Sequence, residues 1–467
     1  MSETLHRSLE EIVARAASGA VTAAALVETH LDALARIGPT LNAVARLEPE
    51  AARAAATRLD AQAVAERGPL HAAPLAHKDL YGRAGWRLEA GSKILAGESA
   101  RSTAHAIAAL DRAGAMDLGR LNTVEFAMGG HGRNVHTGPP RNPWNPAHVT
   151  GGSSSGSAAA VAAGAVPAAL GSDTGGSIRL PAAACGLVGL KPTAGRIGRS
   201  GIFPLSGTLD TAGPLCRTVR DAALMLQALA GPDPRDPQVV DLPVPDCLSG
   251  IEDGLDGLRI GIPRPYFFDP LEGAVAAQTE AAIALLEREG ARIADTAIGG
   301  VETANRLAVL IINAEASAQH RPWLETRARD YGPETLARLI AGLLLPAEAY
   351  LTALGRRRSL LAEVMSGPLA EHDLLAVPCW TTDVPEIAPD AAPGFAKQAM
   401  DIGHCNRPFN MLGLPAIVVP CGLSPTGLPV ALQLVARPFA EATLLRAARA
   451  FERARAFWQD HRPVVMA

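Results

Sequence analysis

The 467-residue sequence is poor in aromatic residues and in charges of either sign: Phe, Trp and Tyr make up 4% of it, and charged residues 19%. It contains no basic run, and 43 Lys and Arg residues stand against 47 Asp and Glu, giving a formal net charge of −4. Direct binding to a phosphate backbone requires a surplus of positive charge on the protein. We therefore expect no direct nucleic-acid partner.

The six cysteines are widely spread, and none forms a CxxC or another zinc-like pair. The amino terminus lacks a basic segment followed by an apolar core, so no secretory signal is predicted. The longest apolar run, residues 158–170, is short, rich in alanine and interrupted by Gly164 and Pro167, which favours a buried helix over a membrane span. These features predict a cytoplasmic protein without a membrane partner.

Glycine is abundant, with 45 residues, and it gathers with serine in two loops. The loops are GGSSSGS at Gly151–Ser157 and GSDTGGSIRLP at Gly171–Pro181, and Lys78 lies upstream of them in the tripeptide HKD. Serines and a lysine can supply a nucleophile and a base without a histidine or a metal. The combination predicts an acyl-transfer enzyme, and within that class an amide hydrolase.

Ser177, in the second loop, is the candidate nucleophile. It follows Thr174, Gly175 and Gly176, whose successive backbone N–H groups meet little side-chain obstruction. A carbonyl carbon can approach the serine hydroxyl while its oxygen meets these amides, which would then form the oxyanion hole.

The two loops and the small-residue segment between them resemble the amidase signature family, and every constrained position from Gly151 to Pro181 fits its motif. The resemblance spans nearly the whole chain. It continues through GLVGLKPTAGRI, SGTLDTAGPLCRTVRDAA, NRPFNMLGLPAIVVPCG and GLPVALQLVARPF.

The resemblance implies a catalytic triad of Ser177 as nucleophile, Ser153 as a bridging serine after a cis peptide bond, and Lys78 as terminal base. An unperturbed lysine, with a pKa of about 10.4, is protonated at neutral pH, so Lys78 must be desolvated or surrounded by donors. A relay from Ser177 through Ser153 to Lys78 would activate the nucleophile and, run backwards, protonate the leaving nitrogen. The plain alternative is that Lys78 pairs with Asp79.

Supporting roles also follow from the resemblance. Asp173 and Arg179 are expected to shape the nucleophile loop by charge-assisted hydrogen bonds, and Ser154 to help orient Lys78. A segment beside the substrate carbonyl is matched by Met128, Gly129 and Gly130. The alternative for this segment is a plain turn after a helix that ends near Phe126.

Other chemistries fit the residues less well. The GGSSSGS loop could be a flexible linker or a phosphate cradle, but no Walker or GxGxxG context surrounds it. Five histidines near these segments raise a metal-dependent amidohydrolase as a rival, but they form no HxH or HExxH pattern: His71, His77, His131, His136 and His148. We expect no metal and no cofactor.

The expected fold is an α/β/α sandwich, with a large mixed central β-sheet covered by helices, in one amidase domain over residues 1–467. A capping box at Ser8 and a cap at Thr22 predict two early helices, the second stopped by Gly38-Pro39. Within the domain we expect N-terminal helices at 1–66, the signature core at 70–230, an exposed connection at 231–257 and a helical variable region near the substrate pocket at 301–367. Strands are predicted at 73–77, 115–119, 166–171, 258–263, 291–296, 374–379, 416–420 and 430–435.

The predicted function is stand-alone hydrolysis of a small-molecule carboxamide through an acyl-serine intermediate, releasing ammonia or an amine. One alternative is the glutaminase (A) subunit of a tRNA-dependent amidotransferase. Another, suggested by EFAMGG and PRNPWNP, is a hydrolase of small urea-derived or carbamate-like amides. A non-catalytic relative is a weaker interpretation because all three triad side chains are present. The sequence leaves open whether the protein forms a homodimer. Five aromatic residues are candidates for the substrate pocket: Trp323, Tyr331, Tyr350, Trp380 and Phe395.

Overall fold

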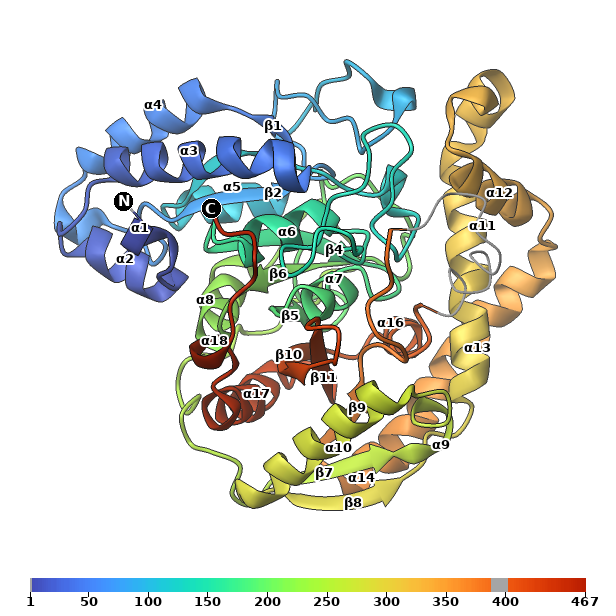
Figure 1. Cartoon of the computed structure of the whole chain (residues 1–467). Coiled ribbons are helices and arrows are strands. Elements are labelled where there is room, and N and C mark those ends of the chain that lie inside the picture. Colours follow the sequence, from blue (N-terminus) through green and yellow to red (C-terminus); the bar gives the residue numbers. More distant parts are fainter. Residues whose placement is uncertain (1, 388–401) are drawn as a thin grey trace.

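The computed structural model describes residues 2–387 and 402–467. The first part of the chain is mostly helical and lies together in Figure 1. Its elements are α1 (Ser2–Leu5), α2 (Leu9–Ala17), α3 (Ala23–Leu41), β1 (Val44–Leu47), α4 (Pro49–Asp60) and the 3-10 turn η1 (Val64–Glu66). The predicted capping box at Ser8 and cap at Thr22 are confirmed. The predicted stop at Gly38-Pro39 is wrong, because α3 continues to Leu41 and ends at Asn42, whose left-handed backbone places its amide on the carbonyl of Gly38.

The segment that carries the two serine loops alternates short strands and helices. Its elements are β2 (Pro74–Lys78), η2 (Lys93–Leu95), α5 (His105–Arg112), β3 (Met116–Leu121), η3 (Glu125–Ala127), α6 (Ser155–Ala162), β4 (Ala168–Asp173), α7 (Arg179–Ala184), β5 (Val188–Lys191), β6 (Thr211–Cys216) and α8 (Val219–Leu229). Every residue of α6 is buried, as expected for a helix that is apolar or small all round. The helix expected to end near Phe126 is only the single turn η3.

Residues 231–257 contain neither helix nor strand. The elements after them are β7 (Arg259–Pro263), α9 (Arg264–Phe267), α10 (Gly273–Arg288), β8 (Arg292–Thr296), α11 (Val301–Arg327), η4 (Ala328–Asp330), α12 (Pro333–Leu343), α13 (Ala347–Ser366), α14 (Pro368–Glu371), β9 (Leu374–Pro378), α16 (Arg407–Leu412), β10 (Ala416–Leu423), β11 (Pro429–Ala436), α17 (Glu441–Arg455) and α18 (Phe457–Asp460).

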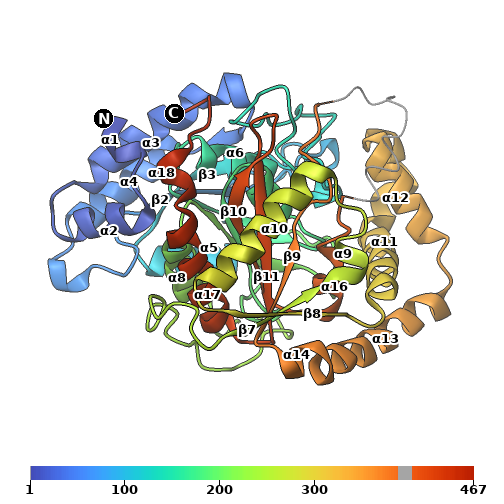
Figure 2. The same cartoon turned by 60° about the horizontal axis from the view of Figure 1, so that its bottom comes forward.

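Eight of the described strands form one mixed sheet in the order β4-β6-β5-β10-β11-β9-β7-β8. Strand β7 runs parallel to β8 and β9, and the other pairs are antiparallel. Helices α8, α10 and α17 pack on one face and α6 and α7 on the other, and Figure 2 shows α10 and α17 across the front of the sheet. The expected sandwich with a large mixed sheet is confirmed.

The predicted strands near the amino end of the core, β2 and β3, do not join this sheet. They pair with each other in parallel, and β1 adds to β3 to make a separate three-stranded sheet. Strand β2 nevertheless lies beside β4. This contact brings the end of β2, with Lys78, next to Ser172 in the second serine loop.

In the described part of the chain, no single helix is long and apolar enough to cross a membrane. Two segments, Pro333–Leu343 and Ala347–Glu371, meet the length and composition test only together, and they are bent by 94° relative to each other.

Candidate active site

Lys78, the last residue of β2, is completely buried. Its Nζ donates hydrogen bonds to Ser153 Oγ at 2.7 Å and to Ser172 Oγ at 2.9 Å. Burial lowers the pKa of Lys78 to about 7, although the negative charges of Asp210 and Asp173 oppose this shift. At neutral pH, a large fraction of the molecules therefore carries an uncharged lysine that can accept a proton.

Ser153 and Ser154 lie directly before α6. The Gly152–Ser153 peptide bond is cis, and the Ser153 carbonyl accepts hydrogen bonds from the Val124 amide and from Thr123 Oγ1. Ser154 is expected to help orient Lys78. Its hydroxyl bonds to the backbone of Ser172, accepting from the amide at 3.3 Å and donating to the carbonyl at 3.4 Å. Any effect of Ser154 on the lysine is therefore indirect.

Ser177 lies in the turn between β4 and α7. Its carbonyl accepts a hydrogen bond from the Ser154 amide at 3.3 Å, which ties the two serine loops together. Ser177 is 8% exposed, whereas Ser153 is fully buried. Of these two serines, Ser177 is thus the one that a substrate can reach from outside.

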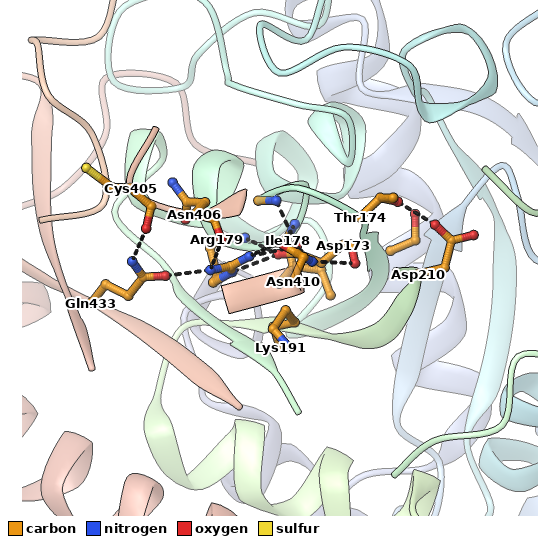
Figure 3. A network of polar contacts seen from close by, with 12 residues as sticks. Asp173, Thr174, Ile178, Arg179, Lys191, Asp210, Cys405, Asn406, Asn410 and Gln433 are labelled. Atoms are coloured by element: carbon orange, nitrogen blue, oxygen red, sulfur yellow. Dashed lines mark hydrogen bonds and ion pairs between the residues drawn. The ribbon is translucent and has the colours of Figure 1, made fainter. Parts of the chain in front are cut away.

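The second serine loop, which carries the candidate nucleophile Ser177, is held by Asp173 and Arg179, both fully buried. Figure 3 shows the contacts of these two side chains. Arg179 donates from Nε to Asp173 Oδ2 and from one terminal nitrogen to Oδ1, each at 2.9 Å. Although burial opposes ionisation, the Arg179 guanidinium holds the pKa of Asp173 well below its usual range. The ionised carboxylate also accepts hydrogen bonds from the amides of Gly176 at 2.8 Å and Ile178 at 3.1 Å.

This arrangement changes the expected oxyanion hole. The amide of Gly176 already donates to Asp173, so its place is in the loop scaffold rather than among the free donors. Glycine is needed there because φ is +121° and a Cβ would lie 2.8 Å from Asn406. The amides of Thr174 and Gly175 form no hydrogen bond with this carboxylate, and the Thr174 hydroxyl donates to Asp210 at 2.5 Å.

Several polar residues of the site did not emerge from the sequence. Arg179 also donates to Asn410 Oδ1 at 2.6 Å and to Gln433 Oε1 at 2.7 Å, and Asn410 donates to Asp173 (Figure 3). Lys191 is buried beside this network, and burial lowers its pKa to about 7. Gln433 is a buried polar residue within the apolar strand β11, a pattern that could have marked it. Ser172, the second hydrogen-bond partner of Lys78, was also missed.

The predicted substrate segment follows η3. Met128 is buried, and a Cβ on Gly130 would lie 2.6 Å from Ile402 and 3.4 Å from Leu180. A few residues further on, Gly132 lies against the backbone of Gly151 and Gly152. The segment therefore runs beside the first serine loop.

The aromatic candidates for the pocket separate into two groups. Trp323 and Tyr331 pack with Phe126, two residues before Met128, in a cluster that also contains Phe203 and His320. Tyr350 instead donates to Glu315 at 2.7 Å, and Trp380 donates to the carbonyl of Leu180 at 3.0 Å. Phe395 lies outside the described residues.

The histidines are not gathered. Among the described residues, no group of three or more His, Cys, Asp or Glu side chains could hold a metal ion. His77 is buried, its Nδ1 accepts the amide of Leu170 at 3.3 Å, and burial lowers its pKa to about 3. It is thus unsuited to replace Lys78 as a base at neutral pH.

The fold and the buried serine–lysine cluster agree with what sequence comparison finds. Residues 25–445 match the family model described as Amidase, and the chain belongs to this family of hydrolases acting on C–N bonds. A curated relative, the A subunit of the glutamyl-tRNA(Gln) amidotransferase of Chloroflexus aurantiacus, is 40% identical over 487 aligned positions covering 99% of both chains.

Solved structures give the same family. A structure described as a vestigial protein complex that reveals the evolutionary origins of an s-triazine catabolic enzyme has a TM-score of 0.89 and 33% identity, covering 96% of this chain and 98% of that one. The A subunit of the Thermotoga maritima glutamyl-tRNA(Gln) amidotransferase has a TM-score of 0.82 and 32% identity, covering 96% and 95%.

Proposed function

We propose that this protein hydrolyses a carboxamide through an acyl intermediate on Ser177, with Ser153 and Lys78 as the proton relay. The observation that carries the proposal is the 2.7 Å hydrogen bond between Lys78 Nζ and Ser153 Oγ, in a site where burial lowers the pKa of the lysine to about 7. A base needs a pKa near the working pH to be both unprotonated and able to take a proton.

In the acylation step, Ser177 Oγ attacks the amide carbon, its proton passes to Ser153, and the proton of Ser153 passes to Lys78. The amides of Thr174 and Gly175 remain as donors for the negative oxygen of the tetrahedral intermediate. The relay then reverses: Lys78 returns its proton to Ser153, and Ser153 protonates the leaving nitrogen. Water repeats the sequence on the acyl group and frees Ser177.

For the substrate, we infer the side-chain amide of glutamine, with the chain acting as the glutaminase component of an amidotransferase. Stand-alone amide hydrolysis, which the sequence favours, is less well supported than this alternative. The curated relatives in Chloroflexus aurantiacus and Moorella thermoacetica, at 40% and 42% identity, are both amidotransferase A subunits. Such a component would release ammonia for use by a partner subunit.

A second candidate is the hydrolysis of small urea-derived amides by the chain alone or in a small complex. The vestigial complex described as revealing the evolutionary origins of an s-triazine catabolic enzyme favours it, because its TM-score is higher than that of the Thermotoga maritima protein. It also agrees with the segments EFAMGG and PRNPWNP.

The test is a comparison of ammonia release from L-glutamine, biuret and simple carboxamides by the purified chain. Glutamine turnover at least tenfold above the other amides, together with a co-purifying partner subunit, would support the glutaminase. Preference for biuret would support the second candidate. Ser177→Ala should abolish every activity, and the exposed Ser366→Ala should not. If no amide is hydrolysed in a Ser177-dependent manner, the proposal fails.

A further inference from the structure

Asp210 lies just before β6 and connects two segments that are distant in the sequence. Its Oδ1 accepts the hydrogen bond from Thr174 Oγ1 at 2.5 Å, as Figure 3 shows. Its Oδ2 accepts the amides of Leu205 at 2.9 Å and Ser206 at 3.0 Å. The carboxylate thus fixes the side chain of Thr174, the residue that opens the candidate oxyanion loop.

Asp210 also shares a cavity with Ser172, a hydrogen-bond partner of Lys78. A cavity of about 260 Å³ is lined by Asp210 and by Ser172, whose hydroxyl accepts the second hydrogen bond of Lys78. Asp210 is the larger of the two electrostatic influences that raise the pKa of Lys78, ahead of Asp173. Asp210 therefore contacts the candidate oxyanion loop directly, through Thr174, and its charge acts on the candidate base.

We propose that Asp210 is a positioning residue that holds Thr174 in place for the oxyanion and supplies the negative charge that stabilises Lys78 when the lysine takes up a proton. This inference rests on the proposed amide hydrolysis. Asp210 does not touch the reacting atoms, and its effect passes through Thr174 and Lys78. In the relay, the proton leaves Ser177, crosses Ser153 and rests on Lys78, which makes an ammonium group near the carboxylate.

The charged groups around this pair limit what a pH profile can report. Asp173 stays ionised because its pKa is held well below the usual range. Arg199 donates to the Asp210 carbonyl at 3.2 Å. Burial raises the pKa of Asp210, while the Thr174 hydroxyl and the two amides oppose the shift. Burial and Asp210 also raise the pKa of Tyr81, away from neutrality.

Lys191 is a second buried lysine, and burial lowers its pKa to about 7. The charges of Arg179 and Arg357 act in the same direction, and those of Asp173 and Glu441 oppose it. Because Lys191 is present in every variant below, the effect of Asp210 is measured as a difference from the wild type.

The first variant is Asp210→Asn, which has the same shape. The amide oxygen can accept from Leu205 and Ser206, and the amide nitrogen can donate to Thr174 Oγ1, so the contacts remain and the charge is lost. The neutral form of Lys78 is then favoured, and the ascending limb of kcat/KM should move to lower pH. The plateau of kcat should fall by about tenfold, because the lysine ammonium formed in the reaction loses its partner charge.

The second pair of variants separates the tether from the charge. Thr174→Val removes the hydroxyl and keeps the carboxylate, so kcat should fall about tenfold with little change in KM and no shift of the pH limb. Thr174→Ser keeps the hydroxyl and should behave like the wild type.

The proposal is overturned if Asp210→Asn leaves the pH limb in place, or if the Val and Ser variants of Thr174 are equally active. If Asp210→Asn does not fold, as judged by circular dichroism and thermal melting, the Thr174 pair still tests the tether, and equal activity of its two variants overturns the proposal. Failure of the proposed function would look different: Ser177→Ala would retain full activity. That result would remove the basis of the inference whatever Asp210 does.

Discussion

Replacing Lys78 by methionine should raise stability and abolish activity, and these opposite effects make it the sharpest test of the site. The two hydrogen-bond partners of Lys78 are serine hydroxyls, and within the described residues no carboxylate forms an ion pair with it. The site therefore disfavours the charged lysine. Methionine has a similar length and no charge to bury.

The magnitude follows from the pKa. A fall from 10.5 to about 7 corresponds to roughly 5 kcal/mol against the charged form in the folded protein. Methionine avoids this cost but leaves the hydroxyls of Ser153 and Ser172 without a partner, which costs about 1–3 kcal/mol for each hydroxyl. With about 2 kcal/mol for each hydroxyl, Lys78→Met should be more stable than the wild type at pH 7 by about 1 kcal/mol. Its kcat/KM should fall by about 10²–10⁴, the usual contribution of a general base.

Lys78→Arg is the matched control, because arginine stays protonated in proteins. It should also lose activity, but without the gain in stability. Urea unfolding at pH 7 and steady-state kinetics on the preferred amide measure both quantities. Near-wild-type activity of Lys78→Arg with an unchanged pH profile would refute the reasoning, since a permanently charged residue cannot be the base. A fall of several kcal/mol in the free energy of unfolding of Lys78→Met would show that burying the lysine charge is not costly.

Three further predictions concern the rest of the site. Ser177→Ala should keep the fold and lose turnover, and a fluorophosphonate should label Ser177 in the wild type by mass spectrometry; labelling elsewhere would end the assignment. Dialysis against a chelator should leave the rate unchanged, because a relay of serines and lysine needs no Lewis acid, and a loss restored by zinc or manganese would favour the histidines. Arg179→Leu should lower the free energy of unfolding by about 3–5 kcal/mol, since Asp173 would remain buried and unpaired. Adding Asp173→Leu should recover part of that loss, and no recovery would contradict the ion-pair explanation.

Much of the fold was accessible from the sequence because the strands are short apolar runs bounded by turns. The strands that were missed show the limit. Strand β6 has the sequence TAGPLC, in which Gly213 and Pro214 indicate a turn. The structure needs the glycine inside the sheet, because a Cβ on Gly213 would lie 2.2 Å from the Leu190 carbonyl of the neighbouring strand. In a sequence, a glycine that allows two strands to approach closely cannot be distinguished from a glycine in a turn.

The candidate site was also predicted only in part from the sequence. The serines and the lysine were accessible because they lie in local motifs whose chemistry depends on the order of neighbouring residues. Asp210, Asn410 and Gln433 are brought to the loop from positions 36 to 254 residues away from their partners, and a single sequence does not report such contacts. The hydrogen bond from the Gly176 amide to Asp173 could not be predicted either, because it depends on the direction in which the Asp173 side chain points.

The buried lysine also predicts how stability varies with pH. Lys78 has a pKa of 10.5 when unfolded and about 7 when folded, so between these values the unfolded chain binds a proton that the folded chain does not. This contribution of Lys78 therefore raises stability with pH, by up to about 1.4 kcal/mol per pH unit. Above about pH 9 the buried cysteines, whose pKa values burial raises, act with the opposite sign. Lys191 contributes a rise of the same sign. Burial raises the pKa of Asp79 to about 6, so this carboxyl group affects stability only at pH values below the window of Lys78. Because Lys78→Met lacks the first contribution, its advantage over the wild type should shrink from pH 7 to pH 9 in urea titrations. An advantage that stays constant over this range would mean that Lys78 does not change its protonation there, and the relay would lose its base.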